Sequence, residues 1–172
     1  YNKPQVKRAF YLSLEFLMGR ALGNHLLNIG ITQEATEALY DYAVTLEDLE
    51  SEEPDAGLGN GGLGRLAARF MDSCATLQLP VIGYGIRYEY GMFRQHIEDG
   101  RQVEDPDHWL VNGNPWEIER AENAQRIHFG GRTEQIITAE GKPCVRWVDT
   151  TDVLAIPFDL PITGYRNNTV NT

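Results

Sequence analysis

Five glycines crowd into the eight residues from Gly57 to Gly64, directly before a long helical pattern. Apolar side chains then recur three and four residues apart as far as Leu77, and Leu79–Pro80 ends the pattern. The sequence therefore predicts a tight glycine turn that opens into a helix of about five turns. Backbone N–H groups at such a turn, together with the helix dipole, suit an anion. Glycines also suit close backbone packing, so the residues alone leave both roles open.

The segment Gly57–Gly62 fits the pattern G-x-G-x-x-G of dinucleotide-binding folds. In those folds an apolar strand leads directly into the glycines, whereas the acidic stretch Glu50–Asp55 precedes them here. A ribose-binding carboxylate is expected about 20 residues later, yet position 82 is Ile and the nearest carboxylate is Glu89. No Lys-Ser/Thr pair follows the glycines, which excludes a Walker P-loop. A nucleotide-binding oxidoreductase module is therefore the weaker alternative.

The composition is that of a globular domain, and its charge limits the partners. The 172 residues contain 15 Lys and Arg against 25 Asp and Glu, a formal net charge of -10. This average field repels polyanions, so we expect neither nucleic acid nor an anionic membrane surface as a partner. The sequence contains no apolar run of about 18 residues, so it predicts no membrane span. Cys74 and Cys144 are too few for a disulfide scaffold, which favours free thiols in a reducing cytoplasm.

Periodicity predicts a mixture of helices and strands. A helical pattern covers Gly19–Leu49, with Thr45 as a fresh N-cap near its end. The other elements that we expect are, in chain order, a strand over Arg8–Glu15, an acidic loop over Glu50–Asp55, a strand over Val81–Tyr90, a hairpin over Met92–Val103 that turns at Asp99–Gly100, an aromatic loop or short helix over Pro106–Glu119, and strands over Arg126–Ile137 and Cys144–Phe158 joined by a turn at Glu140–Pro143. This order indicates an α/β fold with an antiparallel elaboration in the second half.

Candidate catalytic and metal-binding side chains are scarce. The three lysines, Lys3, Lys7 and Lys142, lie in polar segments that do not suit Schiff-base chemistry. A phosphate bound here needs arginines, or residues from elsewhere in a longer protein, as its cations. The four histidines show no metal-ligand spacing, and Asp105 and Asp107 are better interpreted as a solvated loop than as an acid–base pair. The sequence predicts no metal site.

Several long motifs agree on one family. They are Tyr11–Arg20, Asp55–Ala68, Gly83–Gly91, Gly113–Glu117 and Pro161–Tyr165. Read together, they resemble the α-glucan phosphorylase family, in order and without large gaps from about Lys7 to the last residue. The chain reaches its first apolar run at Ala9 and stops at Asn167–Thr172 without a basic or low-complexity tail. We therefore expect residues 1–172 to be an incomplete N-terminal domain of a longer enzyme.

The resemblance implies an architecture and a reaction. The fold would be part of the N-terminal Rossmann-like domain of a two-domain glycosyltransferase-B-type enzyme. The reaction would be reversible phosphorolysis of terminal α-1,4 bonds in glycogen, starch or maltodextrin, giving glucose 1-phosphate. The cofactor would be pyridoxal 5′-phosphate, whose Schiff-base lysine lies outside this segment. The partners would be the glucan, inorganic phosphate or glucose 1-phosphate, and a second copy of the enzyme in a cytoplasmic homodimer.

The resemblance also assigns roles to the glycine turn. The N–H groups of Gly61 and Gly62 would hydrogen-bond the catalytic phosphate, and Leu63 would border the glucosyl subsite. Asn60 would shape the turn. The anion site inferred from the glycines lies at the same place. No catalytic side chain is expected within this segment.

Two further groups of residues follow from the resemblance. Glu15, Leu17 and Arg20 would lie near the cofactor, although Glu15 and Arg20 are equally explained as structural ion-pair partners. Many members of the family carry Tyr at Leu17 and Cys at Arg69, and we interpret Arg69 as a surface cation. Asn114, Pro115 and Trp116 would lie at the dimer contact, with Trp109 closer to the core of its own domain. A non-catalytic glucan-binding fragment is the remaining alternative.

Overall fold

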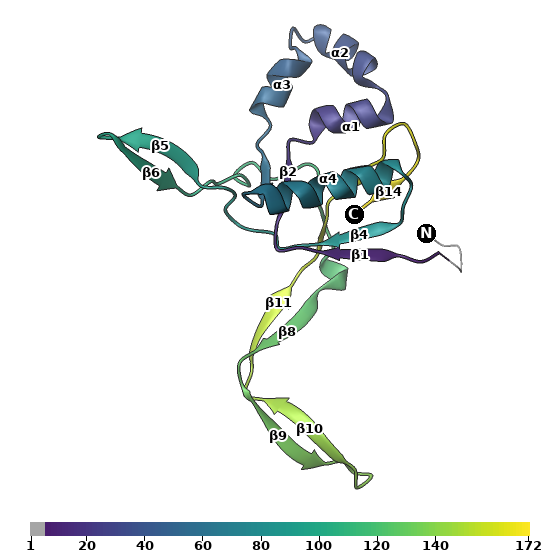
Figure 1. Ribbon diagram of the computed structural model, residues 1–172, viewed down its shortest axis with the longest axis vertical. Helices are drawn as coiled ribbons and strands as arrows, with labels where there is room; N and C mark the ends of the chain where they lie inside the picture. The colour runs from purple at the N-terminus through teal and green to yellow at the C-terminus, as the bar shows by residue number, and fades with distance from the viewer. Residues whose placement is uncertain (1–5) are drawn as a thin grey trace. The chain divides into compact units, whose positions relative to one another are not determined.

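The computed structural model describes residues 6–172, so Lys3 lies outside the described residues. The chain forms two compact units, one that runs to Glu117 and resumes at Leu160–Thr172, and one that comprises Ile118–Asp159. The elements of the first unit are β1 (Ala9–Leu12), β2 (Phe16–Gly19), α1 (Leu22–Ile29), α2 (Thr32–Tyr40), α3 (Leu46–Glu52), β3 (Ala56–Leu58), α4 (Gly62–Thr76), β4 (Val81–Tyr84), β5 (Arg94–Glu98), β6 (Arg101–Asp105), β13 (Ile162–Thr163) and β14 (Val170–Asn171) (Figure 1).

The centre of the first unit is helix α4, which packs on β2, β4 and β13. Strands β1 and β4 pair in parallel, with Ala9 opposite Val81, and α4 lies beside them in Figure 1. Strands β2 and β3 pair antiparallel. The core beneath α4 consists of Phe16, Ala67, Met71, Ala75, Val81 and Ile162. A parallel strand pair covered by a helix confirms the mixed α/β character expected from the sequence.

The apolar pattern of α4 divides between two faces. Ala67 and Ala75 are fully buried and Met71 nearly so, because small side chains let the helix lie close to the strands. Leu63, Leu66, Phe70 and Leu77 belong to the same predicted stripe and are exposed. The expected helix is thus confirmed. Its apolar face is wider than the surface that the other described residues cover, so part of that face is exposed.

The long helical pattern before the glycines is interrupted twice. Gly30 ends α1 in the left-handed conformation, with φ 85°, which glycine adopts without steric cost. Thr45 caps α3 as predicted: its side chain accepts the N–H of Asp48, and the Asp48 carboxylate accepts the N–H of Thr45. Helix α3 runs on to Glu52, so the acidic loop expected over Glu50–Asp55 is shorter than predicted.

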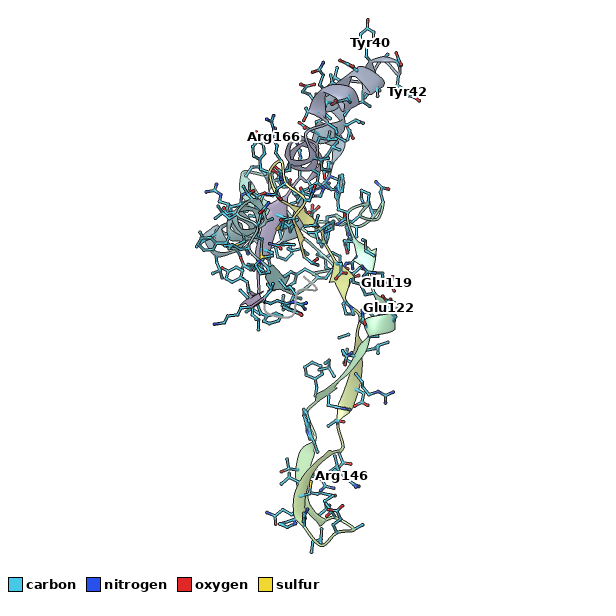
Figure 2. The ribbon with its side chains drawn as sticks, turned by 90° about the vertical axis from the view of Figure 1, so that its right-hand side faces the viewer. Tyr40, Tyr42, Glu119, Glu122, Arg146 and Arg166 are labelled. Atoms are coloured by element: carbon cyan, nitrogen blue, oxygen red, sulfur yellow. The ribbon has the colours of Figure 1, made fainter. Side chains whose placement is uncertain are left out.

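Tyr40 and Tyr42 project from the end of α2, 83% and 79% exposed (Figure 2).

The hairpin predicted over Met92–Val103 is confirmed as β5 and β6. Its turn residues, Asp99 and Gly100, have φ values of 49° and 72°, as the favoured two-residue hairpin turn requires. The strand predicted over Val81–Tyr90 ends at Tyr84 instead. Directly after the strand, Gly85 lies against the ring of Phe16, where a side chain would collide.

The second unit is an antiparallel ribbon. Its elements are β7 (Ile118–Glu119), the 3-10 helix η1 (Ala121–Asn123), β8 (Gln125–Phe129), β9 (Arg132–Ile137), β10 (Pro143–Val148), β11 (Thr151–Ala155) and β12 (Phe158–Asp159). The pairs are β7 with β12, β8 with β11 and β9 with β10, which the predicted turn at Glu140–Pro143 joins. The predicted strand over Arg126–Ile137 is broken into β8 and β9, and the one over Cys144–Phe158 into β10, β11 and the start of β12; Gly130, Gly131 and Asp149, at two of these breaks, have positive φ. Arg146 lies on this ribbon (Figure 2).

No helix among residues 6–172 is long and apolar enough to cross a membrane.

Candidate anion site at the glycine turn

The glycine turn connects β3 to the first residue of α4. Gly61 is the N-cap, with φ -143° and ψ -166°, and no side chain from residues 6–172 caps the helix. The first N–H groups of any helix have no acceptor within the helix. Those of Gly61 and Gly62 are therefore offered outward, at the positive end of a 15-residue helix. This arrangement can hold an anion through backbone N–H groups and the helix dipole together.

The glycines of the cluster serve two different purposes. A methyl group at Gly59 would stand 2.9 Å from Cβ of Glu15, and one at Gly64 would stand 3.0 Å from the same atom. At Gly57 it would meet the backbone of Gly91 and Met92 at 3.1 Å. These three glycines let the turn pack against neighbouring backbone.

Gly61 and Gly62 have no such internal reason to be glycine. A side chain at either position would find nothing within 4 Å among the residues described here. The φ of Gly61 is extended, which any residue adopts, and neither position belongs to the set with positive φ. The backbone at Gly61 and Gly62 thus faces open space, with no side chain in front of it. An external group can therefore approach these backbone atoms closely.

The two classes of glycine predict opposite effects of alanine on folding. Gly59→Ala should lower the free energy of unfolding by about 1–3 kcal/mol, because the methyl group overpacks against β2. Gly61→Ala should change it by less than about 0.5 kcal/mol, because its methyl group enters open space. Denaturant unfolding of the two variants in the complete protein measures the difference. Equal losses would show that the two positions are packed alike.

Glu15 lies against this turn. Its carboxylate accepts the backbone N–H of Asn60 at 3.3 Å, and its Cβ lies beside Gly59 and Gly64. Ser13 holds the backbone of Glu15 in place, because its hydroxyl donates to the Glu15 carbonyl at 2.8 Å. Leu63, in the first turn of α4, is 63% exposed. The structure therefore brings Glu15, Asn60, Gly61, Gly62 and Leu63 together.

The backbone of Leu17 also lies against the turn, since its nitrogen would be 3.2 Å from a methyl group at Gly59 or at Gly64. Leu17 lies on β2 opposite Gly57, and its carbonyl accepts a hydrogen bond from Arg65 at 3.1 Å. Arg20 pairs with Asp55 at 3.8 Å rather than with Glu15. Arg20 therefore has an ion-pair partner in Asp55, and its expected place near the cofactor stays a prediction.

A second cluster was missed by the sequence reasoning. The carboxylate of Glu53 accepts the N–H groups of Ala21 at 2.9 Å and Leu22 at 3.0 Å, and the indole N–H of Trp116 at 2.7 Å. Helix α1 has no cap of its own, so Glu53 satisfies its first N–H groups from 31 residues away. The sequence carries no signal for this contact beyond one more acidic residue in an acidic stretch.

Trp116 has partners within its own chain, which its loop setting did not suggest. Its ring meets His25 edge to face, with 4.7 Å between the ring centres. Burial lowers the pKa of His25, against the opposing effects of the Glu53 charge and a hydrogen bond with the Pro161 backbone. Asn114 caps the same loop, accepting the Trp116 backbone N–H at 3.1 Å. Trp109 is 4% exposed, which confirms its predicted place in the core.

Comparison with known proteins decides the family. A sequence model described as carbohydrate phosphorylase matches residues 39–172. The chain belongs to this family. Over its whole length it is 56% identical to the liver form of glycogen phosphorylase from Ovis aries and 55% identical to the brain form from Homo sapiens. It is 50% identical to a glycogen phosphorylase of Chlamydia trachomatis.

This phosphorylase chain spans about a fifth of the length of those relatives: 20% of the first two and 21% of the third. The expectation of an N-terminal segment from this family is therefore confirmed. Within residues 6–172, no cluster of three or more His, Cys, Asp or Glu side chains could hold a metal ion.

Proposed function

We propose that this chain is the N-terminal part of a cytoplasmic α-1,4-glucan phosphorylase. In the complete enzyme, inorganic phosphate attacks the terminal α-1,4 bond of a glucan and glucose 1-phosphate is released. The segment contributes the glycine turn that binds the catalytic phosphate, as part of the N-terminal Rossmann-like domain of a glycosyltransferase-B-type fold. The parallel pair β1–β4 under α4 is consistent with that domain.

The observation that carries this proposal is the open backbone at Gly61 and Gly62. Their N–H groups donate to oxygens of the phosphate, and the dipole of α4 favours its negative charge. Donors already in place need no reorganisation as charge develops in the transition state. Glu15 supports the turn through the Asn60 N–H, and exposed Leu63 borders the glucosyl unit.

Pyridoxal phosphate fits this proposal only in part within the present chain. The open N–H groups suit a phosphate site. By the family resemblance, Glu15, Leu17 and Arg20 would lie near the cofactor. The described lysines do not suit a Schiff base, because Lys7 is exposed and Lys142 pairs with Glu140 at 3.3 Å in the ribbon. The lysine that holds the cofactor is therefore supplied by the rest of the enzyme. When bound, the cofactor supplies a phosphate group that exchanges a proton with the substrate phosphate.

The direct test is the product formed by the complete protein. Incubation with an α-1,4-glucan and inorganic phosphate should release glucose 1-phosphate, and omission of phosphate should abolish its release. Enzymatic assay of glucose 1-phosphate and of free glucose separates phosphorolysis from hydrolysis. Release of glucose alone, or of neither product, would contradict the proposed function.

The 172-residue chain by itself should release no glucose 1-phosphate. Its donors are backbone N–H groups, and phosphate transfer also needs the cofactor and cationic side chains at the phosphate. The same assay applies, with circular dichroism as the control that the helices have formed. Phosphate-dependent product from the purified chain would show that these residues suffice.

We also propose that Asn114, Pro115 and Trp116 lie at the contact between two copies of the enzyme. Trp116→Ala is a poor test, because it also removes the contacts with Glu53 and His25. Pro115 is exposed, so Pro115→Asp puts a charge at the contact and leaves those interactions in place. Dimerisation should weaken by about 2 kcal/mol, as sedimentation across a dilution series measures. Pro106→Asp, at another exposed proline, is the control, and equal dissociation constants for both variants would remove the interface role.

A further inference from the structure

A cavity lies along the side of α4, away from the glycine turn. Its volume is about 210 Å³, and it is bounded by the start of α1, the middle of α4, Trp116 and the segment Leu160–Ile162. All of these belong to the first unit. None of the roles proposed above for the glycine turn uses this cavity.

The charge of the cavity is opposite to that of the chain. Arg20, Arg65 and Arg69 line it, against one carboxylate, Asp72, in a chain of net charge -10. His25 also lines it, and burial lowers the pKa of that imidazole, so it is neutral near pH 7. The lining side chains therefore carry a net charge of +2, of which Asp55, the partner of Arg20, offsets one unit, so the cavity favours an anion.

Two of the three guanidinium groups have donors to spare. Arg65 is committed, because its side chain donates to the carbonyls of Leu17 at 3.1 Å and Met18 at 3.0 Å. Among the described residues, Arg20 makes only the 3.8 Å ion pair with Asp55. Arg69 has no hydrogen bond or ion pair to any residue between 6 and 172. Guanidinium groups with free donors bind phosphate oxygens in pairs of hydrogen bonds.

We propose that this cavity binds a small phosphate monoester. Arg69 and Arg20 donate to its dianionic head, and Asn24, which already holds Asp72 at 3.4 Å, lies at the same wall. The ring of Trp116 and the side chains of Leu160 and Ile162 contact an apolar body. Arg69, which the sequence suggested to be only a surface cation, thereby becomes a ligand-binding residue.

Phenyl phosphate tests the proposal, because it combines the dianion with an apolar ring. Calorimetric titration of the complete protein should show binding, and phenol, which lacks the charge, should bind much more weakly. Arg69→Ala should weaken binding of phenyl phosphate about 10-fold or more, through loss of charge-assisted hydrogen bonds. Arg69→Lys should retain part of the affinity. Arg94→Ala, which removes the same charge from exposed β5, is the matched control and should bind like the unchanged protein.

Gly62→Pro separates this cavity from the glycine turn, and it should leave binding of phenyl phosphate unchanged. Loss of binding in Gly62→Pro together with full binding in Arg69→Ala would place the probe at the turn and overturn the proposal. Absence of binding to the complete protein would also overturn it, since another part of the enzyme would then fill the cavity.

Discussion

Replacement of Gly62 by proline should lower the turnover of glucan phosphorolysis by about 100-fold or more in the complete enzyme. Proline removes the Gly62 N–H, which we assign to the phosphate, and one lost donor to developing charge has an effect of this size. Proline is well tolerated at the first position of a helix, which is where Gly62 lies. Steady-state rates of glucose 1-phosphate release, at saturating glucan and varied phosphate, give the measurement.

Gly62→Ala is the matched control for this prediction. Alanine keeps the N–H and adds a methyl group where the described protein has nothing within 4 Å. The methyl group crowds the bound phosphate, so turnover should fall, but by less than with proline. Thermal stability and cofactor content should stay the same in both variants. Near-normal turnover of Gly62→Pro would mean that the turn serves packing alone.

Glu53→Ala should lower the free energy of unfolding by about 3 kcal/mol. The substitution removes the acceptor of two backbone N–H groups at the start of α1 and of the Trp116 indole N–H. Partly buried donors left without an acceptor cost about 1–3 kcal/mol each, and water recovers some of that loss. Equilibrium denaturant unfolding followed by tryptophan fluorescence measures the change.

Two neighbouring variants make the Glu53 result specific. Glu52→Ala removes an exposed carboxylate one residue away and should change stability by less than about 0.5 kcal/mol. Glu53→Gln keeps an acceptor without the charge, so it should fall between the two. Equal stability of Glu52→Ala and Glu53→Ala would show that Glu53 does not hold α1.

Local elements were predictable where neighbouring residues determine the conformation. The capping box of Thr45 and Asp48 spans four residues, and the turn at Asp99–Gly100 needs only two residues with positive φ. Helix α4 carries its own start at the glycines and its own stop before Pro80. The short strands β2 and β3 escaped prediction, because three or four residues hold too little periodicity to recognise.

The sequence by itself determined the family, the glycine turn and the helix that follows, because these depend on residues adjacent in the chain. Only the tertiary structure separated the packed glycines, such as Gly59, from the open ones, since the difference lies in whether Glu15 stands in front of them. It alone joined Glu53 to Ala21 and Trp116, which are 32 and 63 residues away. It also placed Arg69, an exposed cation as expected, at the wall of a cavity. Contacts at such separations come from packing, which no local pattern encodes.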